Sequence, residues 1–275
     1  MDKYFSYKNG SLNCHYKHDE KPNKELFKLH THDVCELYIF LYGKGKFLVE
    51  GNEYHLSNGD IILLRPAESH YIDIDPCRPY ERFSVHFNEN FFSAFDKENA
   101  LMQAFFDRLP GTFNRYSRDD FKPEVYKLLI QNMLNKSQNL DLQIVSNLLP
   151  LLYEINAVYK SHRTNDIEGE TLTQQILHYI NDRITDNITL DTICSKFYIS
   201  KPQLCRIFKL ATGSTVQNYI NAKRLVNAKR MLASGISPTK AAQINGFNDY
   251  SVFYRAFCKE YGTTPKQEYN RVETD

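Results

Sequence analysis

The sequence predicts an α+β protein of two domains, in which an antiparallel β domain precedes an all-α domain. Between residues 34 and 87, short runs rich in aromatic and β-branched residues alternate with glycine and asparagine turn signals. From residue 171 onward, apolar residues instead recur at helical spacing. A chain of 275 residues, of which 42% are hydrophobic and 24% are charged, is long enough to bury two such cores.

Six strand-like runs indicate the β domain. Gly43 ends the first run, Gly51-Asn52 is a hairpin signal between two later ones, and Asn58-Gly59 turns the chain into the next apolar segment. Short strands at this spacing are typical of a sandwich or a small barrel. The runs cover residues 34–42, 47–49, 54–56, 60–64, 70–74 and 82–87.

Helical periodicity replaces the strand pattern after this block. Apolar residues keep helical spacing over 125–133 and again over 144–159, which suits either the core of the first domain or a surface between two protomers. The polar stretch 161–170 is the expected linker. We therefore predict a first domain over 1–160 and a helical domain over 171–275.

The last hundred residues contain one helical arrangement twice. Ser200-Lys-Pro-Gln203 is a capping box with proline just inside the helix, which Gly213 ends. Ser237-Pro238 opens a short helix of the second set, and Asn248 is the expected cap of the helix after it. That last helix is expected to carry Val252, Phe253 and Phe257.

This repeated layout is that of a helix-turn-helix, in which one helix braces against DNA and the next enters the major groove. A long helix joins the two sets, and about 20 residues of helix span about 30 Å. One turn of B-DNA is about 34 Å, so the two second helices are expected to enter successive major grooves.

Charge is distributed unevenly between the two parts of the chain. Residues 1–169 hold 20 Lys and Arg against 24 Asp and Glu, whereas residues 170–275 hold 14 against 9. The window 190–271 alone has 13 basic and 4 acidic residues. A basic lobe indicates a polyanionic partner, and charge alone does not distinguish DNA from RNA or a membrane surface.

Residues 190–270 resemble the DNA-binding domain of the AraC/XylS family of bacterial regulators. The resemblance runs through Tyr219-Ile-Asn-Ala-Lys-Arg-Leu225, Gly246-Phe247, Phe253-x-x-x-Phe257 and Gly262-x-x-Pro265. Ala241 and Asn245 depart from the usual pattern, which bears on packing. The outward helical positions and the resemblance assign to DNA the residues Lys201, Pro202, Gln203, Cys205, Arg206, Lys209, Asp249, Tyr250, Ser251, Tyr254 and Arg255.

These side chains suit two kinds of DNA contact. Arg206 and Arg255 can bond a guanine edge, Ser251 can donate or accept, and the rings of Tyr250 and Tyr254 can pack on thymine methyl groups. Lys201 and Lys209 suit phosphates, which position the protein without reading sequence.

The first half resembles the cupin-type barrel often attached to this DNA-binding unit. His30-Thr-His32, Glu36 and Gly43 reproduce the first cupin element, and residues 59–70 resemble the second. The resemblance implies an effector site at His30, His32, Glu36 and His70, with Arg65 and His86 on neighbouring strands. His30, His32, Glu36 and His70 could instead bind a divalent metal or satisfy one another as buried polar groups.

The sequence therefore predicts a transcription regulator that is not an enzyme and needs no cofactor. The expected partners are double-stranded promoter DNA, a small-molecule effector of the carbohydrate class, a second copy of the chain and, for an activator, RNA polymerase. The alternative is a metal-binding cupin enzyme or sensor that also binds DNA. A third class, DNA repair by methyl transfer to cysteine, lacks a Pro-Cys-His motif.

Composition excludes several other classes. The six cysteines are scattered without Cys-x-x-Cys spacing, which argues for free thiols and against a disulfide frame or structural zinc. No apolar run approaches the roughly 18 residues that a bilayer-spanning helix needs, and the N-terminus lacks the apolar segment of a signal peptide. We therefore expect no membrane partner and a cytoplasmic location.

Overall fold

A computed structural model describes residues 3–9, 12–94, 96–135, 139–162 and 171–270 of the chain. Contacts divide the chain into two compact units. The first comprises 1–28, 34–65 and 71–169, and the second comprises 29–33, 66–70 and 170–275. The domain boundaries expected from the sequence stay a prediction, and residues 163–170 of the expected linker 161–170 lie outside the described residues.

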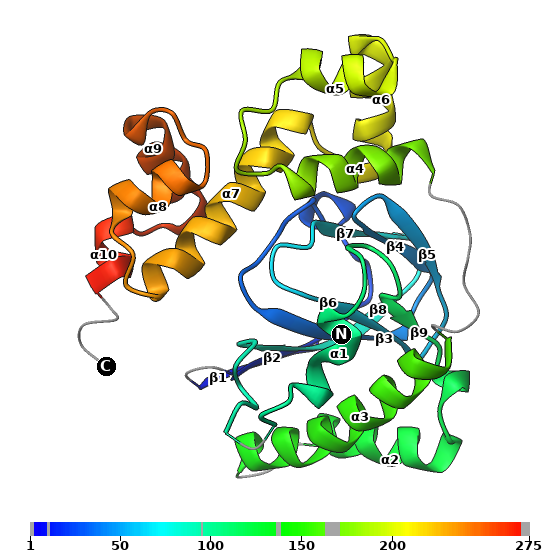
Figure 1. Cartoon of the computed structure of the whole chain (residues 1–275). Helices are drawn as coiled ribbons and strands as arrows, with labels where there is room; N and C mark the ends of the chain where they lie inside the picture. The colour runs from blue at the N-terminus through cyan, green and yellow to red at the C-terminus, as the bar shows by residue number, and fades with distance from the viewer. Residues whose placement is uncertain (1–2, 10–11, 95, 136–138, 163–170, 271–275) are drawn as a thin grey trace. The chain divides into compact units, whose positions relative to one another are not determined.

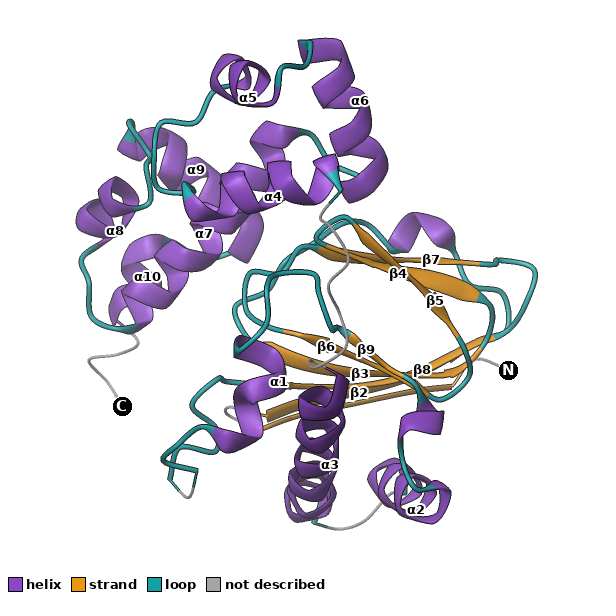
Figure 2. Ribbon diagram, turned by 45° about the vertical axis from the view of Figure 1, so that its right-hand side comes forward, coloured by secondary structure: helices purple, strands orange, loops and turns teal. Residues whose placement is uncertain are grey.

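Two sheets form the framework of the first unit (Figure 2). One has six strands in the order β1-β2-β8-β3-β6-β9, and the other has three in the order β5-β4-β7. The strands are β1 (Lys3–Asn9), β2 (Leu12–Asp19), β3 (Cys35–Tyr42), β4 (Gly45–Val49), β5 (Asn52–Leu56), β6 (Asp60–Leu64), β7 (His70–Ile74), β8 (Tyr80–Phe87) and β9 (Arg115–Tyr116). An antiparallel β domain followed by helices confirms the predicted fold class, although the described strands pair as two sheets and not as one closed barrel.

Helices cover one face of the six-stranded sheet, and the three-stranded sheet lies on its other side (Figure 2). The α-helices and 3-10 helices of this unit are η1 (Lys24–Leu26), η2 (Ala100–Met102), α1 (Gln103–Phe106), η3 (Arg118–Asp120), α2 (Pro123–Leu134) and α3 (Leu140–His162). Leu148, Leu152 and Ile155 of α3 are all buried in the core beneath the sheet. The apolar spacing of 144–159 therefore marks a core helix.

Along β8, successive side chains point alternately into the two cores on either side of the sheet. Phe83, Val85 and Phe87 belong to the core shared with the helices. Tyr80 belongs to the core that faces the three-stranded sheet. Because successive side chains of a strand point to opposite faces, the intervening polar residues of β8 lie on the face of Tyr80.

Seven helices make up the described part of the second unit after residue 170 (Figure 1). They are α4 (Leu172–Asp182), α5 (Leu190–Phe197), α6 (Lys201–Thr212), α7 (Val216–Ala233), α8 (Pro238–Ile244), α9 (Tyr250–Tyr261) and α10 (Pro265–Asn270). The first half of α7 packs with α4, α5 and α6, and its second half packs with α8 and α9. One continuous helix thus belongs to both helical cores.

The helix starts follow the capping signals with two corrections. Ser200 caps α6, because its Oγ accepts a hydrogen bond from the backbone N–H of Gln203 at 3.4 Å, but the reciprocal bond from the Gln203 side chain that a capping box requires is not among those of the described residues. Asp249, not Asn248, caps α9, and its carboxylate accepts from the backbone N–H of Ser251 at 2.6 Å. Val252 was expected among the apolar positions of this helix but is 44% exposed, whereas Phe253 is fully buried.

The predicted β block began at residue 34, and the structure adds two strands before it. β1 pairs with β2, and β2 pairs with β8, all in antiparallel register. Among the described residues, no helix combines the length and hydropathy that crossing a bilayer requires.

Asn156 provides a stability test of the first unit. Its side chain accepts from Ala104 N–H at 2.7 Å and donates to the Leu101 carbonyl at 2.8 Å, which ties α3 to η2 and α1. Asn156→Leu would leave both groups buried without this partner, at about 1–3 kcal/mol each. We expect urea unfolding of the full chain to show a loss of about 2–5 kcal/mol.

Lys160→Leu is the matched control, because Lys160 is an exposed residue of the same helix. Its effect should stay within about 0.5 kcal/mol. Equal unfolding midpoints for the two variants would show that the Asn156 hydrogen bonds do not stabilise the fold.

Candidate functional site

The first helix-turn-helix consists of α5 and α6. Ile193 of α5 and Leu204 and Phe208 of α6 are buried in one core, and this contact fixes which face of α6 is turned inward. Tyr198 in the connecting turn adopts a left-handed conformation with φ 55° and is 95% exposed. This region of backbone conformation favours glycine, so the backbone of Tyr198 is strained although its side chain is exposed to solvent.

The outward face of α6 carries every residue that the sequence assigned to DNA on this helix. All six are exposed, and the buried Leu204 and Phe208 lie on the opposite side. Lys201 Nζ lies 2.7 Å from Asp191 Oδ1, and this hydrogen bond raises the pKa of Lys201. The exposed residues are Lys201, Pro202, Gln203, Cys205, Arg206 and Lys209.

The second helix-turn-helix consists of α8 and α9. Phe253 and Phe257 turn one face of α9 into the core, which leaves Ser251 and Arg255 on the exposed side. Tyr250 and Tyr254 are each 40% exposed, with ring centroids 6.4 Å apart. This face is therefore aromatic where that of α6 is basic.

Asp249 also was assigned to DNA contact from the sequence. It is exposed, but its carboxylate bonds the first turn of its own helix, so the side chain serves as the cap. A negative cap faces phosphates unfavourably, which makes Asp249 the weakest member of the predicted set.

Arg224 of α7 connects the two motifs, a role that sequence reasoning missed. Its guanidinium donates to the carbonyl oxygens of Ile184 at 2.7 Å, Asp186 at 2.6 Å and Gly246 at 2.7 Å. Ile184 and Asp186 precede α5, whereas Gly246 lies between α8 and α9. Burial lowers the pKa of this guanidinium, and the nearby Asp186 opposes that effect.

Gly246 is required at this junction for two reasons. Its φ of 73° favours glycine. A Cβ here would lie 2.6 Å from the Thr185 carbonyl oxygen and 2.9 Å from the Arg224 guanidinium carbon. Gly246-Phe247, part of the pattern by which the sequence resembles the family, therefore lies where the two motifs meet.

Three of the predicted effector residues form a histidine cluster in the second unit. His30 and His70 pair as a β-bridge, with ring centroids 4.3 Å apart, and His32 lies 4.9 Å from His70. His70 is 1% exposed, and its Nδ1 donates to the Glu68 carbonyl at 2.8 Å. That bond fixes the tautomer, with the proton on Nδ1 and the lone pair on Nε2.

The segment that carries this cluster also contacts α7 within the second unit. Asp33 Oδ2 lies 3.0 Å from Lys229 Nζ. The same ammonium group lies 4.7 Å from the centroid of the Tyr261 ring, at the end of α9. Residues 29–33 therefore hold two of the clustered histidines and also Asp33, whose carboxylate forms an ion pair with Lys229 of α7.

Glu36 and His86 form a pair on the six-stranded sheet of the first unit. They are register partners on β3 and β8, with His86 Nε2 3.4 Å from Glu36 Oε1. The ring of His15 on β2 lies 5.6 Å from that of His86. Arg65 follows the end of β6, and its Nη1 donates to the Arg108 carbonyl at 3.2 Å.

Sequence reasoning missed the other polar residues on the same sheet face. Tyr38 and Tyr80 are buried with their hydroxyl oxygens 2.5 Å apart, and Arg82 Nη1 donates to Ser84 Oγ at 3.2 Å. Burial raises the pKa of both tyrosines. The signal was the alternation of β8, in which Tyr80, Arg82, Ser84 and His86 occupy every second position.

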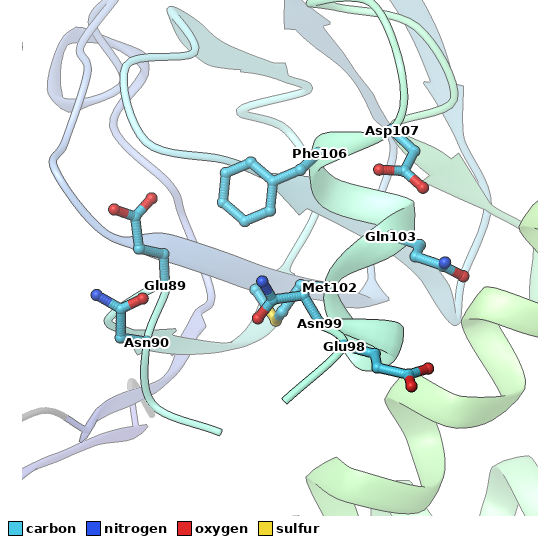
Figure 3. A pocket seen from close by; sticks show the side chains of 8 residues that line it. All are labelled: Glu89, Asn90, Glu98, Asn99, Met102, Gln103, Phe106 and Asp107. Atoms are coloured by element: carbon cyan, nitrogen blue, oxygen red, sulfur yellow. The ribbon is translucent and has the colours of Figure 1, made fainter. Parts of the chain in front are cut away.

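Two pockets of the first unit lie away from the predicted effector residues. One of about 440 Å³ is lined by Met102, Phe106 and three carboxylates of Glu89, Glu98 and Asp107 around α1 (Figure 3). Another of about 270 Å³ lies at the outer end of β2 and β8, where Tyr16 donates to Glu81 at 2.7 Å. Burial, followed by this bond, raises the pKa of Tyr16 to about 12.

Comparison with known families agrees with this geometry. Residues 15–130 match the model of the AraC-like ligand binding domain, and residues 193–271 match a helix-turn-helix domain model. The chain belongs to the AraC/XylS family. It is a DNA-binding transcription regulator with a ligand-binding domain.

Family members of similar length include named activators. The transcriptional activator RhaR of Salmonella dublin is 24% identical over 89% of this chain and 87% of its own length. RhaS of Mannheimia succiniciproducens is 25% identical over 89% and 90%. Among solved structures, ToxT of Vibrio cholerae bound to an unsaturated fatty acid is 13% identical over 98% of both chains, with a TM-score of 0.42.

Arg224→Lys tests whether the guanidinium holds the two motifs together. Lysine keeps the charge but cannot donate to three carbonyls in a planar fork. We expect a loss of about 2–4 kcal/mol in stability, from hydrogen bonds to a charged donor worth about 1.5–3 kcal/mol each. Affinity for a duplex containing both half-sites, measured by fluorescence anisotropy, should fall at least about tenfold.

Arg183→Lys is the control, since Arg183 is an exposed arginine of the same unit. Unchanged affinity in Arg224→Lys, with Arg183→Lys also unchanged, would show that the spacing of the motifs does not depend on Arg224.

Proposed function

We propose that this regulator reads an operator through α6 and α9 together and that a small polar effector controls its action. The observation that carries the proposal is the pair of capped helices, each with a buried aromatic stripe and an exposed face of the predicted contact residues. The continuous helix α7 and the Arg224 hydrogen bonds support simultaneous binding of both.

The effector is proposed to be a carbohydrate or a related metabolite. The predicted effector residues include four imidazole rings, a carboxylate and a guanidinium, which are donors and acceptors suited to hydroxyl groups. Relatives named as transcriptional activators support activation through RNA polymerase. We further propose that the chain acts without enzymatic activity, as a homodimer in the cytoplasm.

A second candidate function rests on His70. Its Nδ1 bond to a backbone carbonyl is the kind of contact that orients metal-binding histidines. With His30 and His32 beside it, a metal-dependent sensor or enzyme is the alternative. Metal analysis of the purified chain separates the two, because stoichiometric zinc, iron or manganese would favour this alternative.

Arg206→Ala and Arg255→Ala test the DNA interface. One arginine lies on the exposed face of each recognition helix, and a bidentate contact to guanine discriminates by about 1–3 kcal/mol. Each substitution should lower operator affinity by about that amount and relax base preference at separate positions. Binding to a library of randomised duplexes measures both effects.

Lys266→Ala is the control, an exposed lysine of α10 outside both recognition helices. A uniform loss across all sequences would identify Arg206 and Arg255 as phosphate contacts and remove them from base reading.

His30→Ala/His32→Ala tests the effector site in the full-length chain. The recognition residues lie on α6 and α9, and His30 and His32 lie outside both helices, so operator affinity without effector should stay within about twofold. The response of reporter expression to the inducing condition should be lost, because a ligand acts only through its different affinity for two states. A folded double variant with an unchanged response would make these histidines structural residues.

A further inference from the structure

The smaller cavity of the first unit lies between the six-stranded sheet and the ends of α2 and α3. Tyr16 of β2 and Phe83 of β8 are register partners, and both pack with the core that the sheet shares with these helices. Glu81 lies two positions before Phe83 on the same strand and therefore shares its face. The pair of Glu36 and His86 lies on the other face of the sheet, so this cavity is separate from it.

The lining of this cavity is mostly apolar. Phe83 and Met133 are 1% and 2% exposed, and Leu134 and Leu140 are half-buried. The cavity has a volume of about 270 Å³. An apolar cavity of about 150 Å³ is enough to bind benzene. A molecule with an apolar body somewhat larger than benzene therefore fits here.

One charged group also lines the cavity. Glu81 Oε1 accepts a hydrogen bond from the Tyr16 hydroxyl at 2.7 Å, and Glu81 Oε2 lies 3.7 Å from His18 Nδ1. That histidine is shared with Glu20, whose Oε1 lies 3.4 Å from His18 Nε2. Among the described residues, no Lys or Arg nitrogen lies within 4.0 Å of the Glu81 carboxylate. Asn135, which follows α2, adds an amide carbonyl to the lining.

We infer that this cavity binds a small apolar amine, whose ammonium group pairs with Glu81 while its hydrocarbon body lies against Phe83 and Met133. An ammonium group has three N–H donors, and its hydrogen bonds to a carboxylate are stronger than those of a neutral donor. The Glu81 side chain is 28% exposed, so the ion pair keeps contact with water and avoids the full cost of burying a charge. The site does not depend on the proposed effector function, because none of its residues is among those predicted to bind the effector.

Matched probe molecules test this assignment in the full-length chain. 2-Phenylethylamine and 2-phenylethanol share one apolar body and differ in an ammonium group in place of a hydroxyl group, whereas ethylamine has the ammonium group without the ring. Ligand binding to the native state raises the melting temperature. We expect 2-phenylethylamine to bind at least about tenfold more tightly than either of the others, measured by scanning fluorimetry and calorimetric titration.

Methionine methyl groups report where the probe binds. The chain has four methionines. Met133 lines this cavity, whereas Met102 lines the pocket of Figure 3 and Met231 belongs to the second unit. In a chain labelled with methyl-¹³C methionine, 2-phenylethylamine should shift the NMR signal of Met133 and leave those of Met102 and Met231 in place. A shift at Met102 or Met231 without one at Met133 would overturn the assignment.

Glu81→Gln keeps an acceptor for the Tyr16 hydroxyl but removes the charge, so this variant should bind the amine and the alcohol equally. Glu20→Gln is the matched control, because Glu20 is exposed, contacts the same histidine and does not line the cavity. This control should keep the preference for the amine. Leu134→Phe fills part of the cavity and should weaken the binding of both probes.

A lysine of the chain itself is the competing occupant. Lys136 follows Asn135 in the sequence and lies outside the described residues. Lys136→Ala should leave the affinity for 2-phenylethylamine unchanged if the cavity takes a free amine. Binding of the amine only after this substitution, or equal binding by wild type and Glu81→Gln, overturns the inference.

Discussion

The hydrogen bonds of Arg224 are the interaction on which the DNA-binding unit depends. Two helix-turn-helix motifs on one long helix can read adjacent grooves only if their rotation about that helix is fixed. The guanidinium fixes it by donating to the segment before α5 and to the turn before α9 at once. Gly246 completes the junction, since any side chain there would enter the space of the guanidinium.

In the first unit, the two faces of the six-stranded sheet pack against different surroundings. One face packs against the helices, and the other faces the three-stranded sheet. Strand alternation turns Phe83 and Val85 toward the helices and Arg82 and Ser84 toward the other interior. The helical core supplies the stability, since buried apolar area is the dominant favourable term in folding. Polar residues are then tolerable on the opposite side of the same strands, where they bond one another, as Arg82 bonds Ser84 and His86 pairs with Glu36.

Local signals allowed the helical unit to be predicted more fully than the β unit. Helix caps and 3.6-residue spacing are encoded within a few neighbouring residues, so the repeat was recognisable from Ser200, Gly213 and Phe253. The one-residue error at Asn248 arose because two cap-forming residues are adjacent, and the carboxylate of Asp249 interacts more favourably with the helix N-terminus. β2 was missed because its inward positions are His15 and Lys17, which break the apolar run that marks a strand.

The polar residues on the inner face of the six-stranded sheet could be predicted only in part, because cross-strand register is not a local property. The histidine motif predicted His30, His32 and Glu36 from their spacing in one segment, whereas Arg82 and Tyr38 come together only when β3 and β8 pair. Alternation within β8 did place Arg82 and His86 on one face, but a charged residue at that position reads equally well as solvent-exposed. The structure shows instead that Arg82 is partly buried and that the carboxylates of Glu36 and Asp19 help to raise its pKa, so its charge is compensated within the same domain.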